Sequence, residues 1–166
     1  MDWDRIIRRQ TRMAKADWSV FGEIAQDESA TAEAGVIVLA VSLVSAVGAG
    51  LTRRGLGGFL ATLVVGALLN WLLWSFVTQF VGTRLFGGEA TFWEMARSIG
   101  YANAPGVLGI LQVSPCLGRR AGLVGLVLSL VLGFFAVRET LDLPTDKTII
   151  TIVVGWVIVV IISLAL

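Results

Sequence analysis

The carboxylates of this sequence that could take part in chemistry lie in two short charged segments, residues 89–97 and 138–147. In the second segment, Asp142 and Asp146 are of the residue type that serves hydrolases and transferases. The sequence has no histidine and a single cysteine, Cys116, which removes the commonest metal ligand, the commonest general base and any internal disulfide. Neither a glycine-rich phosphate loop nor metal-ligand spacing accompanies the carboxylates. We therefore expect a protein that is not an enzyme and that needs no cofactor or metal.

Uncharged polar side chains lie inside long apolar stretches of the sequence. An unpaired amide in hydrocarbon costs about 1–3 kcal/mol or more, so these side chains should face other helices or a polar space. The helical pattern breaks at Pro105 and Gly106, and broken backbone is the usual way to expose carbonyl groups at membrane depth. Two interpretations stay open, hydrogen bonding between helices and a path for a small solute. The candidate polar site comprises Asn70, Tyr101, Asn103, Pro105 and Gln112.

Basic residues gather near the N-terminus, where their spacing predicts an amphipathic helix over residues 2–16. At about 100° per residue, one face gathers Trp3, Ile6, Ile7, Met13 and Ala14, opposite the basic side chains. Anionic headgroups would attract the basic face at about 1 kcal/mol per charge, and tryptophan suits the interface. The predicted lipid-binding residues are Trp3, Arg5, Arg8, Arg9, Arg12 and Lys15. Two alternatives stay open: docking of this helix on the protein's own loops with the arginines solvated, and docking in an acidic groove of a partner protein.

The composition predicts a membrane protein. Hydrophobic residues make up 56% of the 166 residues and charged residues only 15%, which leaves too little polar surface for a soluble domain. The formal net charge is +1, and the charges are local, with a basic cluster from Arg5 to Lys15 and an acidic patch from Asp27 to Glu33. From this distribution we expect no nucleic-acid partner.

The chain divides into a polar cytoplasmic segment, residues 1–33, and a membrane domain, residues 34–166, that contains five apolar blocks. A block of about 20 residues spans a hydrocarbon core of about 30 Å at about 1.5 Å per residue. Prolines, glycines and amides interrupt the third block, so we expect its helix to be kinked or broken near Pro105. The predicted fold is an all-α integral membrane protein, a bundle of five transmembrane helices with an N-terminal amphipathic interfacial helix. The expected crossings are residues 34–51, 56–81, 98–117, 121–137 and 148–166.

Two local patterns predict how these helices begin and pack. Thr91 and Glu94 have the spacing of a capping box, in which each side chain bonds a free backbone N–H group at the start of a helix. Small residues at every fourth position make a smooth stripe, which lets helix backbones approach closely in lipid. We expect these stripes to pack within the chain or against a second copy. They comprise Ser42, Ala46 and Gly50; Gly58, Thr62 and Gly66; and Ala121, Gly125, Ser129 and Gly133.

Several short motifs, taken in order, resemble the Yip-domain family, five-pass membrane proteins named for interaction with Ypt/Rab GTPases. The likeness is of the prokaryotic type and covers most of the chain from Trp18 onward. The motifs keep their order and spacing relative to the five apolar blocks, which makes the likeness more specific than any single motif. They are Val20–Asp27 and Ser29–Thr31 before the first block, Gly87–Glu94, Gly100–Tyr101 with Pro105, and Val137–Leu141 before the last block.

This resemblance implies a helical membrane domain with a cytoplasmic N-terminus and no catalytic residues. Eukaryotic members act in vesicle transport and membrane shaping by binding prenylated GTPases and one another. The sequence lacks the Asp-Leu-x-Gly-Pro element typical of those members and has a short head, so the resemblance does not extend to a GTPase partner. It implies a non-enzymatic adaptor or scaffold that organises membranes or acts in a trafficking-like role. The alternative function is a small-solute channel or transporter built around the broken third block.

The distribution of positive charge predicts the orientation of the chain. With five crossings, nine lysines and arginines lie on the side of the N-terminus, and four, the pairs Arg53–Arg54 and Arg119–Arg120, lie on the other side. Positive charge favours the cytoplasmic side. We therefore expect an integral protein of a prokaryotic cell membrane with its N-terminus in the cytoplasm and its C-terminus outside. The expected partners are membrane lipids, anionic ones in particular, and other membrane proteins or a second copy of the chain.

Overall fold

The computed structural model describes the backbone of residues 2–48, 55–113 and 118–165, and the side chains of residues 2–44, 67–108 and 123–161. Within the described residues, every element of secondary structure is helical. The elements are the α-helices α1 (Trp3–Ala14), α2 (Val20–Gln26), α3 (Ala30–Gly48), α4 (Gly55–Phe86), α5 (Phe92–Ala102), α6 (Gly118–Leu141) and α7 (Thr145–Ala165), and a 3-10 helix, η1 (Ala104–Val113), between α5 and α6.

The helices follow the apolar blocks of the sequence. The first, second, fourth and fifth blocks fall mostly within α3, α4, α6 and α7. The third block is divided, because α5 ends at Ala102 and η1 begins at Ala104. Pro105 has no N–H group to donate and restricts the residue before it, so the α-helix ends just ahead of it. The break expected near Pro105 is therefore confirmed.

The surface of α6 is apolar and largely exposed in the described structure. Its segment Leu123–Leu141 is 19 residues long, and only 28% of the apolar window in it lies buried. Among the described residues, this is the one segment long and apolar enough to cross a membrane, and Ala30–Val44 is a shorter apolar helix. Leu126 and Leu130 are both more than half exposed. An apolar surface of this extent is stable in lipid or against protein rather than in water.

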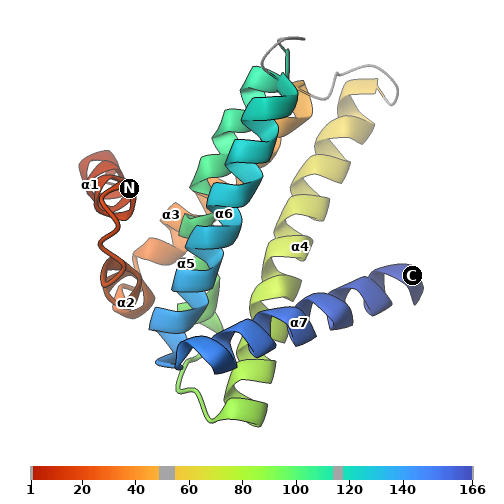
Figure 1. Cartoon of the computed structure of the whole chain (residues 1–166). Helices are drawn as coiled ribbons and strands as arrows, with labels where there is room; N and C mark the ends of the chain where they lie inside the picture. The colour runs from red at the N-terminus through yellow and green to blue at the C-terminus, as the bar shows by residue number, and fades with distance from the viewer. Residues whose placement is uncertain (1, 49–54, 114–117, 166) are drawn as a thin grey trace.

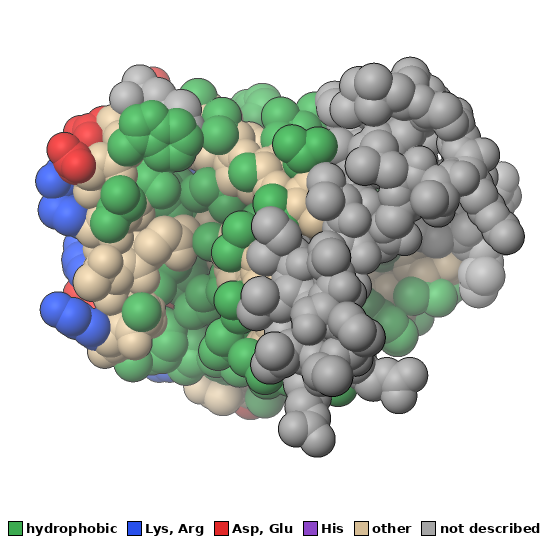
Figure 2. All heavy atoms as spheres, turned by 90° about the horizontal axis from the view of Figure 1, so that it is seen from above, with side chains coloured by type: hydrophobic (Ala, Val, Ile, Leu, Met, Phe, Trp, Pro, Cys, Tyr) green, Lys and Arg blue, Asp and Glu red, His purple; other side chains and the backbone are tan. Residues whose placement is uncertain are grey.

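The helices form a bundle with the polar head, which comprises α1 and α2, at its side. α5 and η1 pack against α3, α6 packs against η1 and α5, and α4 packs beside α3 and α5 (Figure 1). α7 contacts α4 and crosses it obliquely in Figure 1. In the same view α1 is seen nearly end-on while α6 is seen from the side, so the head helix lies across the direction of α6. Figure 2 shows charged side chains gathered at the edge where the head lies, and a largely hydrophobic surface over the rest of the described part of that face.

The centre of the bundle depends on a close approach of α3, α4 and α5 around Gly100. A Cβ atom at Gly100 would lie 2.6 Å from the Cβ of Ala34 and 3.2 Å from its Cα. The indole N–H of Trp71 in α4 donates a hydrogen bond of 2.9 Å to the carbonyl oxygen of Ala96 in α5. All eight residues of the run Met95–Ala102 are buried. α2, α3, α4 and α6 therefore pack around α5.

Two of the local patterns in the sequence have direct counterparts in the structure. The hydroxyl of Thr91 accepts a hydrogen bond from the N–H of Glu94, and the Glu94 carboxylate accepts one from the N–H of Thr91, which confirms the capping box. In the α6 stripe, a Cβ at Gly125 would lie 3.1 Å from the carbonyl oxygen of Pro105, whereas nothing lies within 4 Å at Gly133. The stripe thus packs on η1 near its start and is open further along. Apart from Ser42 and Ser129, the other stripe residues lie outside the described side chains.

Replacement of Gly100 by leucine should destabilise the bundle, because the added side chain meets the backbone of α3 as well as its side chains. Overpacking of this kind costs about 1–3 kcal/mol. The matched control is Gly133→Leu, which adds the same side chain to a helix at a position with open space. Thermal unfolding of the purified variants in detergent measures the difference. Equal unfolding temperatures for the two variants would show that α3 and α5 do not approach each other this closely.

Candidate functional site

The head helix α1 docks on the rest of the chain through a face that mixes apolar and charged side chains. Ile6, Arg9 and Met13 are buried in this contact. Trp3 and Ile7 point outward, and each is 61% exposed. The apolar face expected from the sequence is therefore divided. Ile6 and Met13 lie in the docking contact on either side of Arg9, whereas Trp3 and Ile7 remain outside it.

Arg9 is the centre of an ion-pair cluster that joins α1 to α2, to α3 and to the turn between them. Its guanidinium donates to Asp27 at 2.6 Å, to Glu23 at 3.2 Å and to Glu33 at 3.3 Å. Glu33 is itself buried, and it also accepts a hydrogen bond from the hydroxyl of Tyr101 in α5. Buried charges are stable only where they are paired and hydrogen-bonded, and both conditions hold here. The cluster therefore ties the head to α3 and α5.

Arg5 and Arg12 extend this cluster along one flank of α1. Arg5 binds the buried Glu33 at 2.7 Å. Arg12 binds Asp17 at 2.8 Å and Glu23 at 2.5 Å. An isolated exposed pair contributes at most about 1 kcal/mol, whereas these pairs share partners and one partner is buried. We call the whole set the head network: Arg5, Arg9, Arg12, Asp17, Glu23, Asp27, Glu33 and Tyr101.

The pKa of Asp27 shows how the head network responds to pH. Partial burial raises this pKa, but hydrogen bonds from Ser29 and Arg9 outweigh the burial and hold it at about 2, below its ordinary value of 3.8. A folded-state pKa below the unfolded value stabilises the folded form above a pH of about 4. This contribution is lost as the pH falls toward 2. At neutral pH the Asp27 carboxylate therefore holds the head in its docked position.

The predicted lipid-binding residues fall into two groups in the structure. Arg5, Arg9 and Arg12 are held by carboxylates of the chain itself, whereas Trp3, Arg8 and Lys15 are exposed on the outside of α1. Residues 1–33 hold five basic and seven acidic side chains, so this segment has a formal charge of −2. With the head docked, the exposed group is the part of α1 most accessible from outside the chain, and lipid binding by these residues stays a prediction.

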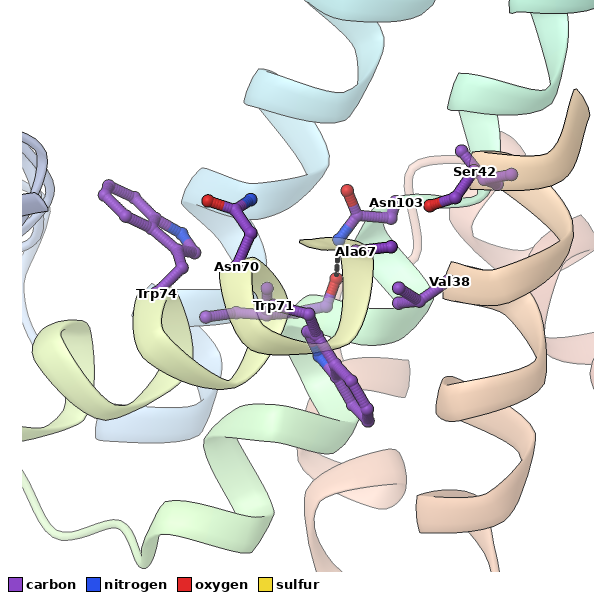
Figure 3. Close-up of a pocket in the computed structure, with 9 residues that line it drawn as sticks. Val38, Ser42, Ala67, Asn70, Trp71, Trp74 and Asn103 are labelled. Carbon is purple, nitrogen blue, oxygen red and sulfur yellow. Dashed lines mark hydrogen bonds between the residues drawn. The ribbon is translucent and has the colours of Figure 1, made fainter. Parts of the chain in front are cut away.

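A cavity of about 140 Å³ lies between α3, α4 and the end of α5 (Figure 3). The amide nitrogen of Asn103 donates 2.8 Å to the carbonyl oxygen of Ile99, and Asn70 lies on the facing turn of α4. No charged side chain contributes to the described lining. Such a space suits water or a small uncharged molecule that can form hydrogen bonds. The lining residues are Val38, Val41, Ser42, Ala67, Asn70, Trp71, Trp74, Ile99 and Asn103.

The structure brings together only part of the candidate polar site. Asn70 and Asn103 line the cavity from two different helices. Tyr101 is fully buried but belongs to the head network. Pro105 lies in η1, with its carbonyl oxygen toward α6. The side chain of Gln112 lies outside the described residues.

A comparison with protein families identifies the chain. A family model described as the Yip1 domain matches residues 19–166, which include α2 and every later helix. The chain belongs to the Yip1-domain family. This confirms the resemblance that the motifs indicated, and it shows a membrane-associated protein of a family whose members interact with other proteins. No match was found among curated proteins or among solved structures.

Sequence reasoning missed the acidic side of the head network in this Yip1-domain chain. Glu33 stands directly before the first apolar block, and a carboxylate at such a boundary needs a cation close by. The basic cluster of α1 is the nearest source of such a cation in the sequence. The pairing of Glu33 with α1 could therefore have been inferred. Trp71 and Trp74 were not assigned to the cavity either, although they follow Asn70 within about one turn of α4.

Replacement of Arg9 by glutamine should release α1 from the bundle, because Glu23, Asp27 and Glu33 lose the cation that they share. Loss of one partner of a buried pair costs about 3–5 kcal/mol, and we expect the lower end because Glu23 and Asp27 reach water. Amide hydrogen exchange of residues 3–14 in nanodiscs measures the release.

The control for this experiment is Arg8→Gln, which makes the same change of charge at the next residue of α1. Arg8 is exposed and takes part in no ion pair with the described residues. Exchange should rise by orders of magnitude in Arg9→Gln and stay near the wild-type rate in Arg8→Gln. The same exchange rate in both variants would contradict a docked head.

Proposed function

We propose that this Yip1-domain chain is a non-enzymatic adaptor or scaffold that organises a membrane or recruits proteins to it. The observation that supports this proposal is the head network, because it fixes the polar head in one orientation on an apolar bundle. A fixed surface loses less conformational entropy on binding than a flexible segment does. The head is therefore suited to present a recognition surface.

The carboxylates that could have served an enzyme give no support to catalysis. Asp142 and Asp146 are both exposed, one at the end of α6 and the other in the first turn of α7. In the part of the chain that the structure describes, no group of three potential metal ligands converges. Exposed carboxylates at helix ends are ordinary solvated groups.

In the proposed arrangement, α3, α4, α5 with η1, α6 and α7 form five crossings of a prokaryotic cell membrane. The N-terminus is cytoplasmic and the C-terminus is outside, so α1, α2 and the connections at residues 87–91 and 142–144 share the cytoplasmic side. Large exposed apolar side chains on α6 and α7 support contact with lipid or with other membrane proteins, including a second copy of the chain. They include Leu123, Val127, Leu130, Val153, Trp156 and Ile161.

A photoreactive amino acid at Arg8, an exposed position of α1 about 100° around the helix from Ile7, tests the adaptor function in cells that express the full chain. We expect cross-links to a protein, and we expect Arg9→Gln to lower their yield several-fold because the head is no longer held in place. Glu89→Gln, a change at an exposed position in the connection at 87–91, should leave the yield unchanged. Cross-links to lipid alone, or a protein adduct that Arg9→Gln does not affect, would contradict the proposal.

A second candidate function is passage of a small uncharged solute, which the cavity supports. Asn70 and Asn103 place amide groups from two helices in one uncharged space beside the break between α5 and η1. Broken backbone is found at membrane depth where it borders a polar cavity.

Swelling of proteoliposomes in glycerol tests this second function. If the cavity is part of a path, swelling should be several-fold faster than in vesicles without protein, and the double variant Asn70→Leu, Asn103→Leu should abolish the difference. Leu69→Ala, next to Asn70 but outside the cavity lining, is the control and should keep the rate. Swelling equal to that of empty vesicles would rule out glycerol passage and leave the adaptor function as the one that the structure supports.

A further inference from the structure

α1 has an apolar flank and, on the opposite side of the helix, a flank of ion-paired arginines. At about 100° per residue, Trp3, Ile7 and Ala14 fall within about 40° of one another, and we call them the apolar flank. Arg5 and Arg12 lie about 170° away around the helix. The buried docking face, which contains Arg9, lies between the two flanks. α1 therefore meets the bundle with one face, turns its ion-paired arginines to one side and turns its apolar flank to the other.

The apolar flank is uncovered in the described structure. Trp3 and Ile7 stand one helical turn apart, and each keeps 61% of its surface exposed. The family is membrane-associated, and α1 lies across the direction of α6, which is the orientation of a helix in the plane of a bilayer that α6 spans (Figure 1). Tryptophan is the residue that best suits the boundary between headgroups and acyl chains. A lipid surface therefore fits this flank in chemistry and in orientation.

The charges around α1 do not supply an attraction to anionic lipid. The arginines of the opposite flank are bound by Asp17, Glu23 and Glu33. The exposed charged side chains of the head helix and its cap are balanced, two acidic and two basic: Asp2, Asp4, Arg8 and Lys15. Binding of an interfacial helix to a membrane depends on the apolar area that it buries and on the attraction of its charges to the lipid. For α1 only the apolar area can contribute.

We propose that the apolar flank of α1 inserts into the cytoplasmic interface of the bilayer that holds the bundle, and that this insertion does not depend on anionic lipid. The head network directs the insertion, because it fixes the rotation of α1 and so decides which flank meets the membrane. The partner is the lipid surface itself, with Trp3 at headgroup level. This inference requires a membrane-embedded bundle and a docked head, but it requires neither adaptor activity nor solute passage.

Site-directed spin labelling of the full chain tests the inference. In a Cys116→Ser background, a nitroxide is attached at Trp3→Cys, Ile7→Cys or Arg8→Cys, and the protein is reconstituted into vesicles of phosphatidylcholine alone or with added phosphatidylglycerol. Collision with oxygen reports the apolar phase, and collision with a water-soluble nickel chelate reports the aqueous phase. Ile7 and Arg8 are adjacent and both exposed, so Arg8→Cys is a control on the same helix about 100° around it.

For labels at positions 3 and 7, we expect the ratio of oxygen to nickel collisions to exceed that at position 8 several-fold, equally in both kinds of vesicle and at low and high salt. Equal ratios at positions 7 and 8 would overturn the proposal, because α1 would then have no lipid-facing side distinct from a water-facing side. Insertion only in vesicles with phosphatidylglycerol would also overturn it, since the basic residues would be driving the contact. Protection of position 7 from both reagents would overturn it too, by showing a protein contact instead of lipid.

Discussion

A carboxylate at the boundary of an apolar helix is the constraint on which the arrangement of this chain depends. Glu33 lies in the first turn of α3 and is buried, so its charge must be balanced by groups from elsewhere in the fold. Arg5 and Arg9 of α1 supply that balance, and the hydroxyl of Tyr101 donates a further hydrogen bond to the carboxylate. Because these partners come from α1 and α5, satisfying one carboxylate positions the head on the bundle and sets the rotation of α1. The split of α1 into a docking face and two flanks follows from that rotation.

The second constraint is space around α5. At Gly100 the absence of a side chain lets α3 approach to contact, and the Trp71 indole fills the remaining side and donates to the α5 backbone. Two residues after Gly100 the α-helix stops, because Pro105 cannot continue its hydrogen bonds. The cavity lies at this stop, where Asn103 ends α5 and Asn70 faces it from α4. The tight packing at Gly100 and the polar cavity at Asn103 therefore lie within one turn of each other, at the end of the helix around which the bundle packs.

Features that depend on neighbours in the sequence could be predicted, and features that depend on distant residues could not. The capping box at Thr91 and the break before Pro105 follow from local backbone chemistry, and both are present. The pairing of Arg9 with Glu33 joins residues 24 positions apart, and Tyr101 is 92 positions from Arg9. Periodicity assigns α1 a basic face and an apolar face, but it holds no information on where counter-charges will lie. For the same reason it could not show that Asn70 and Asn103 share a cavity while Tyr101 does not.

The arginines of α1 can serve both the proposed orientation and the docked head, because the two roles belong to different stages. During insertion, lysines and arginines near a crossing set orientation and acidic residues contribute little, so the formal charge of −2 over residues 1–33 does not oppose a cytoplasmic N-terminus. Once the bundle has folded, Arg5, Arg9 and Arg12 are occupied by carboxylates and no longer act as free positive charge. The part of α1 that remains available to a membrane is its uncovered apolar flank. The contact proposed for the folded protein therefore depends on Trp3 and Ile7 and not on the arginines from which the sequence predicted lipid binding.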